Sequence, residues 1–328
     1  MNIRAAKLRG VQAAAEVHAK LGLLDRVRNG LEQIDVFAAI NDLGIPVMCR
    51  PLEGLLGAYF TTPTPGILVT TNRKLPVQRF TAAHELGHFW MKHSDALDSE
   101  ESIAQARQGV AGVPLQEIEA EAFASEFLLP KSLIYNTLVR HKWKKADLAN
   151  PTITYQLSLR LGVSYEATWR ALLECAFINQ ATANHLKTVA PKDSKIDVLK
   201  EYKLANPWSD AFLLTQVDSS SHINASKEDT VVIELSEHSA SGYRWSNIEN
   251  DGTTEVLVDQ VLTQLGKEYG SVSTRKIILR GTSKTHIHLE ERRPWEVGSK
   301  PLKTFDLSID FNGKEVGLPR AVKNAIKL

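Results

Sequence analysis

Two histidines four residues apart, His84 and His88, occur in the stretch RFTAAHELGHFW, and Glu85 follows the first of them. On an α-helix, residues four apart lie on one face, so both imidazole rings can bind one metal ion. Glu85 lies about 100° around the helix from His84, where it can reach a water on that ion without being a ligand. This is the H-E-x-x-H arrangement of zinc hydrolases, in which the metal activates a water and the glutamate takes its proton.

A catalytic zinc site needs a third protein ligand and leaves a fourth position for water. A second helical stretch, LQEIEAEAFASEFLL, carries four glutamates. Glu117 and Glu121 share one face with small and apolar residues, whereas Glu119 and Glu126 point the other way, toward the predicted solvent side. We therefore predict Glu117 as the third ligand. We predict that Glu121, one turn later, accepts the free N–H of a ligand histidine and orients its ring.

The alternative is an ordinary surface helix that carries a histidine pair. It leaves unexplained why an Ala-rich helix with glutamates follows so soon in the chain. His93 faces away from His84 on the first helix, and we interpret it as a solvated C-terminal cap. Zn²⁺ is the expected cofactor, and Mn²⁺ and Fe²⁺ remain alternatives.

The elements around these residues change character along the chain. Residues 7–41 have helical periodicity, and the short runs IPVMCR, LGAYFTT and GILVTTN, bounded by Pro and Gly, predict strands. PTPG predicts a hairpin turn between the last two runs, just ahead of the histidine helix at residues 76–92. Since extended peptides often add as a strand to a sheet edge, we expect the substrate to pair with this hairpin.

Beyond about residue 190 the helical period gives way to alternating runs such as TVVIELSE, STRKIILRG and KTHIHLEE. Many short strands at regular spacing favour a β-sandwich. We predict a domain at residues 1–195, a β-sandwich domain at 205–311 and a basic tail at 312–328. The expected fold class is α+β, with a helical first domain that holds a small antiparallel sheet and an all-β, immunoglobulin-like second domain.

The first 185 residues resemble the ImmA/IrrE family of bacterial metallopeptidases, through RFTAAHELGH and EIEAEAFASEFLLP. The resemblance implies a zincin-like fold with His84, His88 and Glu117 as metal ligands and Glu85 as the catalytic base. This sequence departs from the family at residue 121, where Glu stands in place of the usual Asn. The resemblance also implies a helix-turn-helix transcriptional repressor as substrate, whose cleavage would regulate transcription, for example in a stress response.

Residues 208–311 resemble chagasin-like inhibitors of papain-type cysteine proteases. The family's three recognition loops correspond to SASGYRW, LGKEYGSVS and ERRPWE, although Ser239 and Ala240 replace the family's Asn-Pro-Thr and the middle loop lacks the glycine cluster. Candidate partner-binding residues in the first and third loops are Gly242, Tyr243, Trp245, Arg293, Pro294 and Trp295.

Aromatic residues on loops shaped by Gly and Pro are typical of protein contacts. The alternative is that Trp245 and Trp295 cover the core of the sandwich. A contact surface would bind either a separate protein or the chain's own first domain.

Lys+Arg number 39 and Asp+Glu 38, so the overall charge favours neither direct nucleic-acid binding nor an anionic membrane. Two cysteines and no apolar leader indicate a cytoplasmic protein without a membrane span. The leading interpretation is a zinc endopeptidase that acts on a protein substrate. One rival is a non-catalytic binding module or cysteine-protease inhibitor that acts through the C-terminal loops. The other is a defence- or toxin-type protease held inactive by its own second domain.

Overall fold

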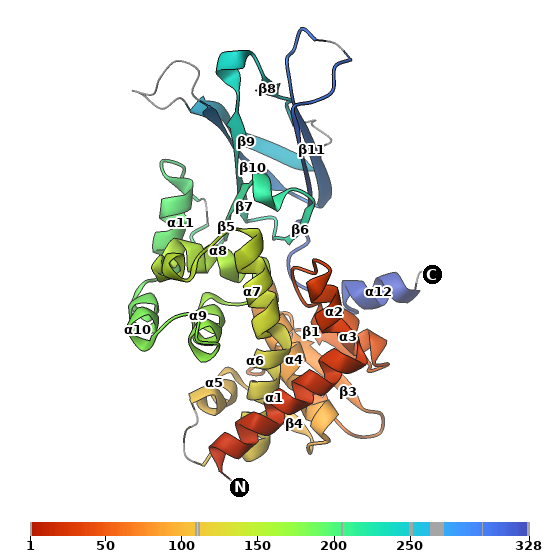
Figure 1. Ribbon diagram of the computed structural model, residues 1–328. Coiled ribbons are helices and arrows are strands. Elements are labelled where there is room, and N and C mark those ends of the chain that lie inside the picture. The colour runs from red at the N-terminus through yellow and green to blue at the C-terminus, as the bar shows by residue number, and fades with distance from the viewer. Residues whose placement is uncertain are drawn as a thin grey trace. The chain divides into compact units, whose positions relative to one another are not determined.

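The computed structural model describes residues 2–108, 110, 112–204, 206–248, 252–262, 272–296 and 298–326 (Figure 1). The chain forms two compact units. The first unit contains Met1–Ala149, Leu157–Lys187 and Lys314–Leu328, and the second contains Asn150–Gln156 and Thr188–Gly313. The final segment, which the sequence predicts as part of a separate tail, is therefore part of the first unit from Lys314 onward.

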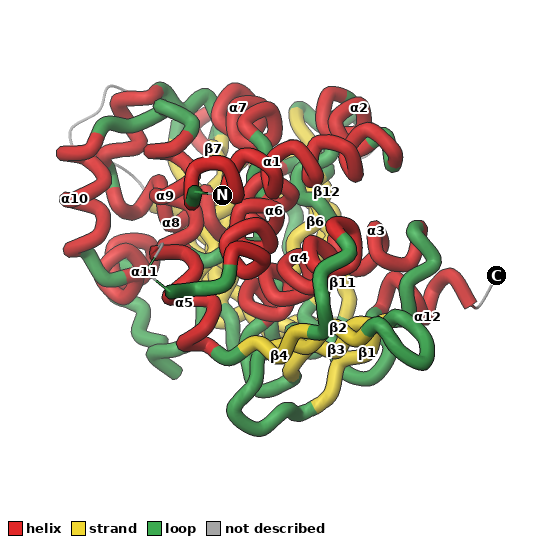
Figure 2. Tube along the Cα trace, turned by 90° about the horizontal axis from the view of Figure 1, so that it is seen from below, coloured by secondary structure: helices red, strands yellow, loops and turns green. Residues whose placement is uncertain are grey.

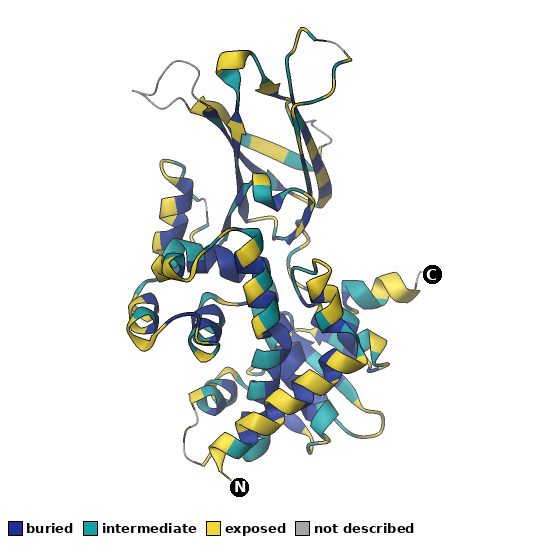
Figure 3. Ribbon diagram, in the orientation of Figure 1, coloured by how far each residue is buried: buried dark blue, intermediate teal, exposed yellow. Residues whose placement is uncertain are grey.

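Helices make up most of the first unit. Helix α6 (Leu115–Leu128) packs against both α1 (Ile3–Lys20) and α4 (Leu75–Met91). Two glycines permit this close packing: a Cβ at Gly10 would lie 2.2 Å from the Glu119 carbonyl oxygen, and one at Gly87 would lie 3.1 Å from the Phe123 ring. As a result α6 is buried on two sides, and buried residues gather where it meets α4 (Figure 3).

The remaining helices follow the chain around this centre. They are α2 (Leu23–Arg28), α3 (Val36–Asp42), α5 (Glu100–Gln108), α7 (Lys131–Arg140), the 3₁₀ helix η1 (Lys145–Ala149), α8 (Pro151–Leu161), α9 (Tyr165–Glu174), α10 (Gln180–Thr188) and α12 (Arg320–Ile326). Helix α8 spans the division between the units, since its residues up to Gln156 are assigned to the second.

A four-stranded sheet lies along α4, in the order β1-β3-β2-β4 (Figure 2). Its strands are β1 (Val47–Arg50), β2 (Gly57–Phe60), β3 (Gly66–Thr70) and β4 (Ala96–Asp98). The predicted β2–β3 hairpin is present and antiparallel, but β1 pairs with β3 in parallel, so the sheet is mixed. The expectation that this hairpin forms the free edge is wrong, because β2 lies between β3 and β4. The edge strands are β1 and β4, and β4 is absent from the elements predicted from the sequence.

The C-terminal segment closes the first unit at the other edge. Gly317 exchanges two backbone hydrogen bonds with Cys49 of β1, at 2.7 and 2.8 Å. The fully buried side chain of Gln78 on α4 accepts from the Glu315 backbone N–H and donates to the Glu315 carbonyl. These contacts precede α12 and anchor the segment to both the sheet and the histidine helix.

The second unit has two four-stranded sheets, ordered β5-β7-β10-β9 and β6-β12-β11-β8. Strand β11 alternates exposed and buried residues, which places Ile287 and Leu289 in the core. This arrangement confirms the predicted α+β class with a β-sandwich-like C-terminal half. The elements are α11 (Pro191–Leu199), β5 (Ala211–Thr215), η2 (Gln216–Asp218), β6 (Ser221–Asn224), β7 (Thr230–Glu237), η3 (Ser239–Ser241), β8 (Arg244–Trp245), β9 (Thr254–Leu262), β10 (Ser273–Gly281), β11 (Lys284–Arg292) and β12 (Lys303–Asp310).

Helix α11 explains why β7 and β10 contain nearly continuous apolar runs. Val198 and Leu199 of α11 pack against Val232 of β7 and Ile278 of β10. The neighbours of Val232 and Ile278 in these strands point to the opposite face and are also buried. Strands covered on both faces need apolar side chains at successive positions.

Candidate metal centre

His84, His88 and Glu117 converge in the first unit as the helical spacing predicts. The two Nε2 atoms are 3.1 Å apart. Glu117 Oε2 lies 3.3 Å from the Nε2 of His84 and 3.5 Å from the Nε2 of His88. Both histidine side chains are fully buried, and Glu117 is 7% exposed. The alternative of a surface helix with a histidine pair therefore does not describe α4.

A fourth potential ligand, Asp98 of β4, completes the cluster. Its Oδ2 is 3.5 Å from His84 Nε2 and 3.8 Å from His88 Nε2. One donor atom from each of the four residues lies within 4.8 Å of all the others. The sequence analysis missed Asp98, because it is in a three-residue strand without a motif around it.

The donor set fits a divalent metal ion such as zinc. Bonds of about 2.0–2.2 Å in a tetrahedral site place the ligand atoms roughly 3.3–3.6 Å apart, close to the separations seen here. Two imidazoles with two carboxylates are ligands that zinc accepts. The buried Oδ2 atom of Asp98 has no hydrogen-bond partner in the described part of the chain, as expected for an atom directed at a cation.

The site balances buried charges even without an ion. Burial alone lowers the pKa of His84, but the contacts with the carboxylates of Asp98 and Glu117 outweigh it and raise the pKa to about 10. Burial alone raises the pKa of Glu117, yet the contacts with His84 and His88 hold it well below its usual value. A proton on His84 therefore compensates the carboxylates, in the place where a metal ion would.

Glu85 lies beside the cluster under β2. Its side chain is fully buried, and neither carboxylate oxygen makes a hydrogen bond to a described residue. Burial first, and then the nearby carboxylates of Asp98 and Glu117, raises the pKa of Glu85 well above its ordinary value. An acid whose pKa lies above its ordinary value is suited to both accepting and returning a proton.

A chain of hydrogen bonds supports His88 from behind. His93 Nδ1 lies 3.0 Å from His88 Nδ1, and His93 Nε2 lies 3.0 Å from Glu119 Oε2. If Nε2 of His88 binds the metal, its Nδ1 carries the proton and donates to His93, which in turn donates to Glu119. Burial lowers the pKa of His93 to about 4, which keeps the ring neutral as this arrangement requires. Glu119 also pairs with Arg9 of α1.

The hydrogen bonds of His93 correct two expectations from the sequence. His93 is not a solvated cap, since its side chain is 9% exposed, and Glu119 does not face solvent, since it is 3% exposed. Both are buried because α1 covers the side of α6 that the periodicity assigned to water. Glu121, predicted to orient a ligand histidine, instead accepts a hydrogen bond from Arg107 at 2.8 Å.

Glu121 and Arg107 line a cavity of about 430 Å³ bounded by residues of α1, α4, α5, α6 and α9. The half-buried Glu126 and the exposed Glu174 also line the cavity. Burial and the charge of Glu174 raise the pKa of Glu126 to about 7. Glu126 is thus not on a freely solvated face either.

In the second unit, the first and third of the predicted recognition loops contact each other. The Trp295 ring covers Gly242, where a Cβ would lie 2.3 Å from the indole, and Gly242 has φ +81°. Arg293 lies 4.7 Å over the ring of Tyr243, and its Nε donates to the Ser241 carbonyl. Pro294 is exposed in the adjoining turn. The middle loop, LGKEYGSVS, falls largely outside the described residues.

The structure separates the two tryptophans that the sequence left as equivalent alternatives. Trp245 is 2% exposed, and its indole N–H donates to the Ser236 carbonyl, so it belongs to the core. Trp295 is 67% exposed and is available for contact. Of the two tryptophans, only Trp295 fits the expectation of a binding surface.

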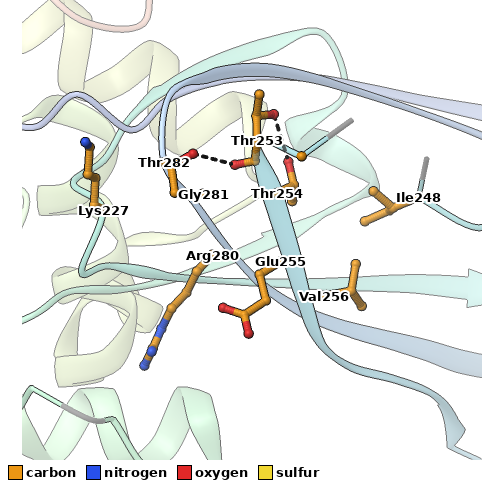
Figure 4. Close-up of a pocket in the computed structure, with 10 residues that line it drawn as sticks. Lys227, Ile248, Thr253, Thr254, Glu255, Val256, Arg280, Gly281 and Thr282 are labelled. Carbon is orange, nitrogen blue, oxygen red and sulfur yellow. Dashed lines mark hydrogen bonds between the residues drawn. The ribbon is translucent and has the colours of Figure 1, made fainter. Parts of the chain in front are cut away.

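An open hollow of about 700 Å³ also occurs in the second unit, where the ends of β9 and β10 meet (Figure 4). Lys227, Glu255 and Arg280 line it with mixed charge, and Thr282 N–H donates to the Thr253 carbonyl at its margin. None of the loop residues singled out in the sequence lines this hollow.

Comparison with protein-family models matches two separate segments of the chain. Residues 40–173 match the Peptidase_M78 model, described as the IrrE N-terminal-like domain. Residues 224–309 match the chagasin family peptidase inhibitor I42 model. The first match contains His84, Glu85, His88 and Glu117. The second contains both the loop with Gly242 and the loop with Trp295.

Two solved structures are similar to part of the chain. The cysteine protease inhibitor EhICP2 from Entamoeba histolytica is 28% identical, covering 32% of this chain and 99% of that one, with a TM-score of 0.30. Amebosin is 22% identical, covering 31% of this chain and 96% of that one, with a TM-score of 0.26. A search of curated proteins gave no match. Among the described residues, no helix has the length and apolar character needed to cross a bilayer.

Proposed function

Because this chain joins an IrrE N-terminal-like domain of the M78 metallopeptidase type to a chagasin family domain, we propose that it is a zinc-dependent endopeptidase. The observation that carries the proposal is the convergence of His84, His88 and Glu117 beside a buried Glu85. His84, His88 and Glu117 would hold the ion, with Asp98 close to it.

Zinc bound there would lower the pKa of a water and polarise the scissile carbonyl. Glu85 would take the proton of the attacking water and deliver it to the leaving amine. Gly57 of β2 leaves room for the Glu85 carboxylate. The hydrogen bonds between His88 and His93 and between His93 and Glu119 fix the ring of His88. Each of these residues positions a group without contacting the substrate.

We place the substrate along β4 rather than along the β2–β3 hairpin. Strand β4 is one edge of the sheet and carries Asp98 into the metal cluster, whereas β1 at the other edge is hydrogen-bonded to Gly317. Leu97 between its buried neighbours is 63% exposed. An extended peptide that pairs with this edge would be held by backbone hydrogen bonds next to the metal.

The family resemblance of the first 185 residues favours a helix-turn-helix repressor as the protein substrate, in the cytoplasm. Incubation of the purified zinc-loaded protein with the repressor encoded beside its gene, followed by mass spectrometry of the products, tests this. Glu85→Gln is the matched control, since it keeps the metal ligands and the side-chain size but cannot accept the proton. Equal cleavage by wild type and Glu85→Gln would rule out the proposed chemistry.

A second candidate function belongs to the C-terminal loops, which would bind a papain-type cysteine protease. The exposed Trp295, packed on Gly242, favours it. Inhibition of papain by the full chain, present in both metal-loaded and chelated protein and lost in Trp295→Ala, would support this function. Inhibition that is the same in Trp295→Ala and wild type would exclude these loops as the contact.

A further inference from the structure

The metal cluster contains one protein donor more than a hydrolytic site uses. Catalytic zinc is held by three protein ligands with water in the fourth position, whereas sites with four protein ligands are closed. His84, His88 and Glu117 already supply three donors. Oδ2 of Asp98 lies 3.5 and 3.8 Å from the two Nε2 atoms, and the donor atoms of all four residues lie within 4.8 Å of one another, so Asp98 is placed to be a fourth ligand of the same ion.

Asp98 is held in this orientation by its surroundings. The residue is 2% exposed, and its backbone carbonyl accepts from Leu56 N–H at 2.7 Å. Ser102 Oγ is 3.4 Å from Oδ1, whereas Oδ2 makes no hydrogen bond within the described chain and faces the Nε2 atoms of His84 and His88 at ion-pair distances of 3.5 and 3.8 Å. A buried carboxylate oxygen without a donor costs free energy unless a cation meets it. Since Oδ2 of Asp98 faces the imidazole nitrogens, a cation bound by both imidazoles would also meet this oxygen.

We propose that Asp98 is the fourth protein ligand of the resting metal site, so that Oδ2 occupies the position that the hydrolytic water needs. The proposal rests on the metal site of the proposed function. A site closed by Asp98 would leave the resting protein latent, and withdrawal of Oδ2 would open the position for water. Asp98 is on the edge strand proposed to pair with substrate, so a bound peptide acts on the same backbone that carries the fourth ligand.

Cobalt(II) in place of zinc reports the ligands through its visible absorption. With four protein ligands, the wild-type cobalt spectrum should be tetrahedral and unchanged by added thiocyanate, because no solvent position is open. Asp98→Ala should still bind one cobalt ion, and its spectrum should shift on addition of thiocyanate. A wild-type spectrum that shifts as strongly as that of Asp98→Ala overturns the proposal.

Zinc affinity gives an independent readout by competition with a chromogenic chelator. Outer-shell partners of a metal ligand contribute about 10–100-fold to affinity, so loss of a direct ligand in Asp98→Ala or Asp98→Asn should exceed about 100-fold. A smaller loss places Asp98 outside the direct ligands and overturns the proposal. Asp95→Asn is the control, because this exposed carboxylate three residues earlier accepts from Thr61 and is outside the cluster.

These measurements separate the proposal from the proposed function. Metal content of His84→Ala tests whether the site binds metal at all, and neither the spectra nor the affinities depend on peptidase activity. If the Asp98 variants do not fold, as judged by circular dichroism of the full chain, the thiocyanate titration of the wild type decides alone.

Discussion

Gly57 of β2 lies against the carboxylate of Glu85: a Cβ at position 57 would be 2.3 Å from Glu85 Oε1 and 2.4 Å from the Thr81 methyl group. The absence of a side chain at residue 57 thus provides the space that the carboxylate of Glu85, the proposed base, occupies. The three atoms nearest to this Cβ belong to Glu85 and Thr81, and none of them belongs to a proposed metal ligand.

Gly57→Ala is therefore expected to displace the Glu85 carboxylate and lower kcat by at least about 10-fold, because misplacement of a catalytic group by about 1 Å can cost 100-fold. Zinc content should stay at one ion per chain. Steady-state kinetics together with metal analysis check this. Unchanged kcat in a folded variant would show that the contact has no catalytic consequence.

Glu119→Gln should weaken zinc binding by about 10–100-fold, because it removes the negative charge that accepts from His93 and so weakens the hydrogen bonds that orient His88. Glu121→Gln is the matched control on the same helix, since Glu121 pairs with Arg107 instead. Competition with a chelator measures both affinities. A larger loss in Glu121→Gln than in Glu119→Gln would restore the role that the sequence alone assigned to Glu121.

Chelation should destabilise the wild-type protein. A ligand that binds only the folded state stabilises it by about 4 kcal/mol when present at about 1,000 times its Kd. Removal of zinc with EDTA should therefore lower the Tm of the wild type in thermal unfolding. In His84→Ala the Tm should not respond to EDTA. An equal EDTA shift in both proteins would place the stabilising metal elsewhere.

Substitution of the two tryptophans should separate core from surface. Trp245→Ala should cost about 3–5 kcal/mol of unfolding free energy, as for other buried aromatic residues, because it removes a 2% exposed ring and its bond to Ser236. Trp295→Ala should stay within about 0.5 kcal/mol of wild type. Urea unfolding of the full chain, followed by tryptophan fluorescence and circular dichroism, measures both. Similar losses in the two variants would contradict this assignment.

Glu126 should make part of the protein's stability depend on pH. Its pKa is raised from 4.5 to about 7, mainly by burial and then by the charge of Glu174, while Lys7 and Cys175 also line the cavity. As pH rises from 4.5 to 7 the unfolded chain loses this proton before the folded one, so folding stability decreases across that window. Above about pH 7 the folding stability does not decrease further through Glu126.

Glu126→Gln remains neutral at every pH. The variant should therefore be more stable than wild type at pH 8, and the difference should disappear below about pH 4.5. Urea unfolding at a series of pH values gives the difference directly, because other titrating groups cancel between the two proteins. A difference that does not change with pH would show that Glu126 has an ordinary pKa.

The shared face of His84 and His88 on α4, and the face of α6 that carries Glu117, follow from local rules, whereas their convergence depends on the packing of α4 against α6. Residues four apart on α4 share a face in any helix, and the face of α6 that carries Glu117 was identified from its small neighbours. The β2–β3 hairpin was likewise signalled by its turn residues. In each case the information lies within one or two turns or strands of the chain.

Asp98 and the His93–Glu119 contact depend on tertiary packing. Strand β4 has three residues, too few for a periodic pattern, and its position comes from pairing with β2. An amphipathic interpretation of α6 assumes one wet side, but α1 approaches so closely at Gly10 that this side is buried. A glycine in the middle of an otherwise Ala-rich helix was the available signal for this close approach.

The return of the chain to β1 and α4 after the sandwich means that the second unit is, in connectivity, an insertion rather than an appendage. A stop codon near residue 200 would remove not only the sandwich but also Glu315 and Gly317. Gln78 would then lose its bonds to Glu315 and keep its bond to the Thr70 carbonyl, and β1 would lose its two bonds to Gly317. Loss of the proposed activity in such a truncation would report damage to the first unit itself. Whether the sandwich restrains or assists the first unit can be asked only with a spliced gene that deletes the interior and keeps the end.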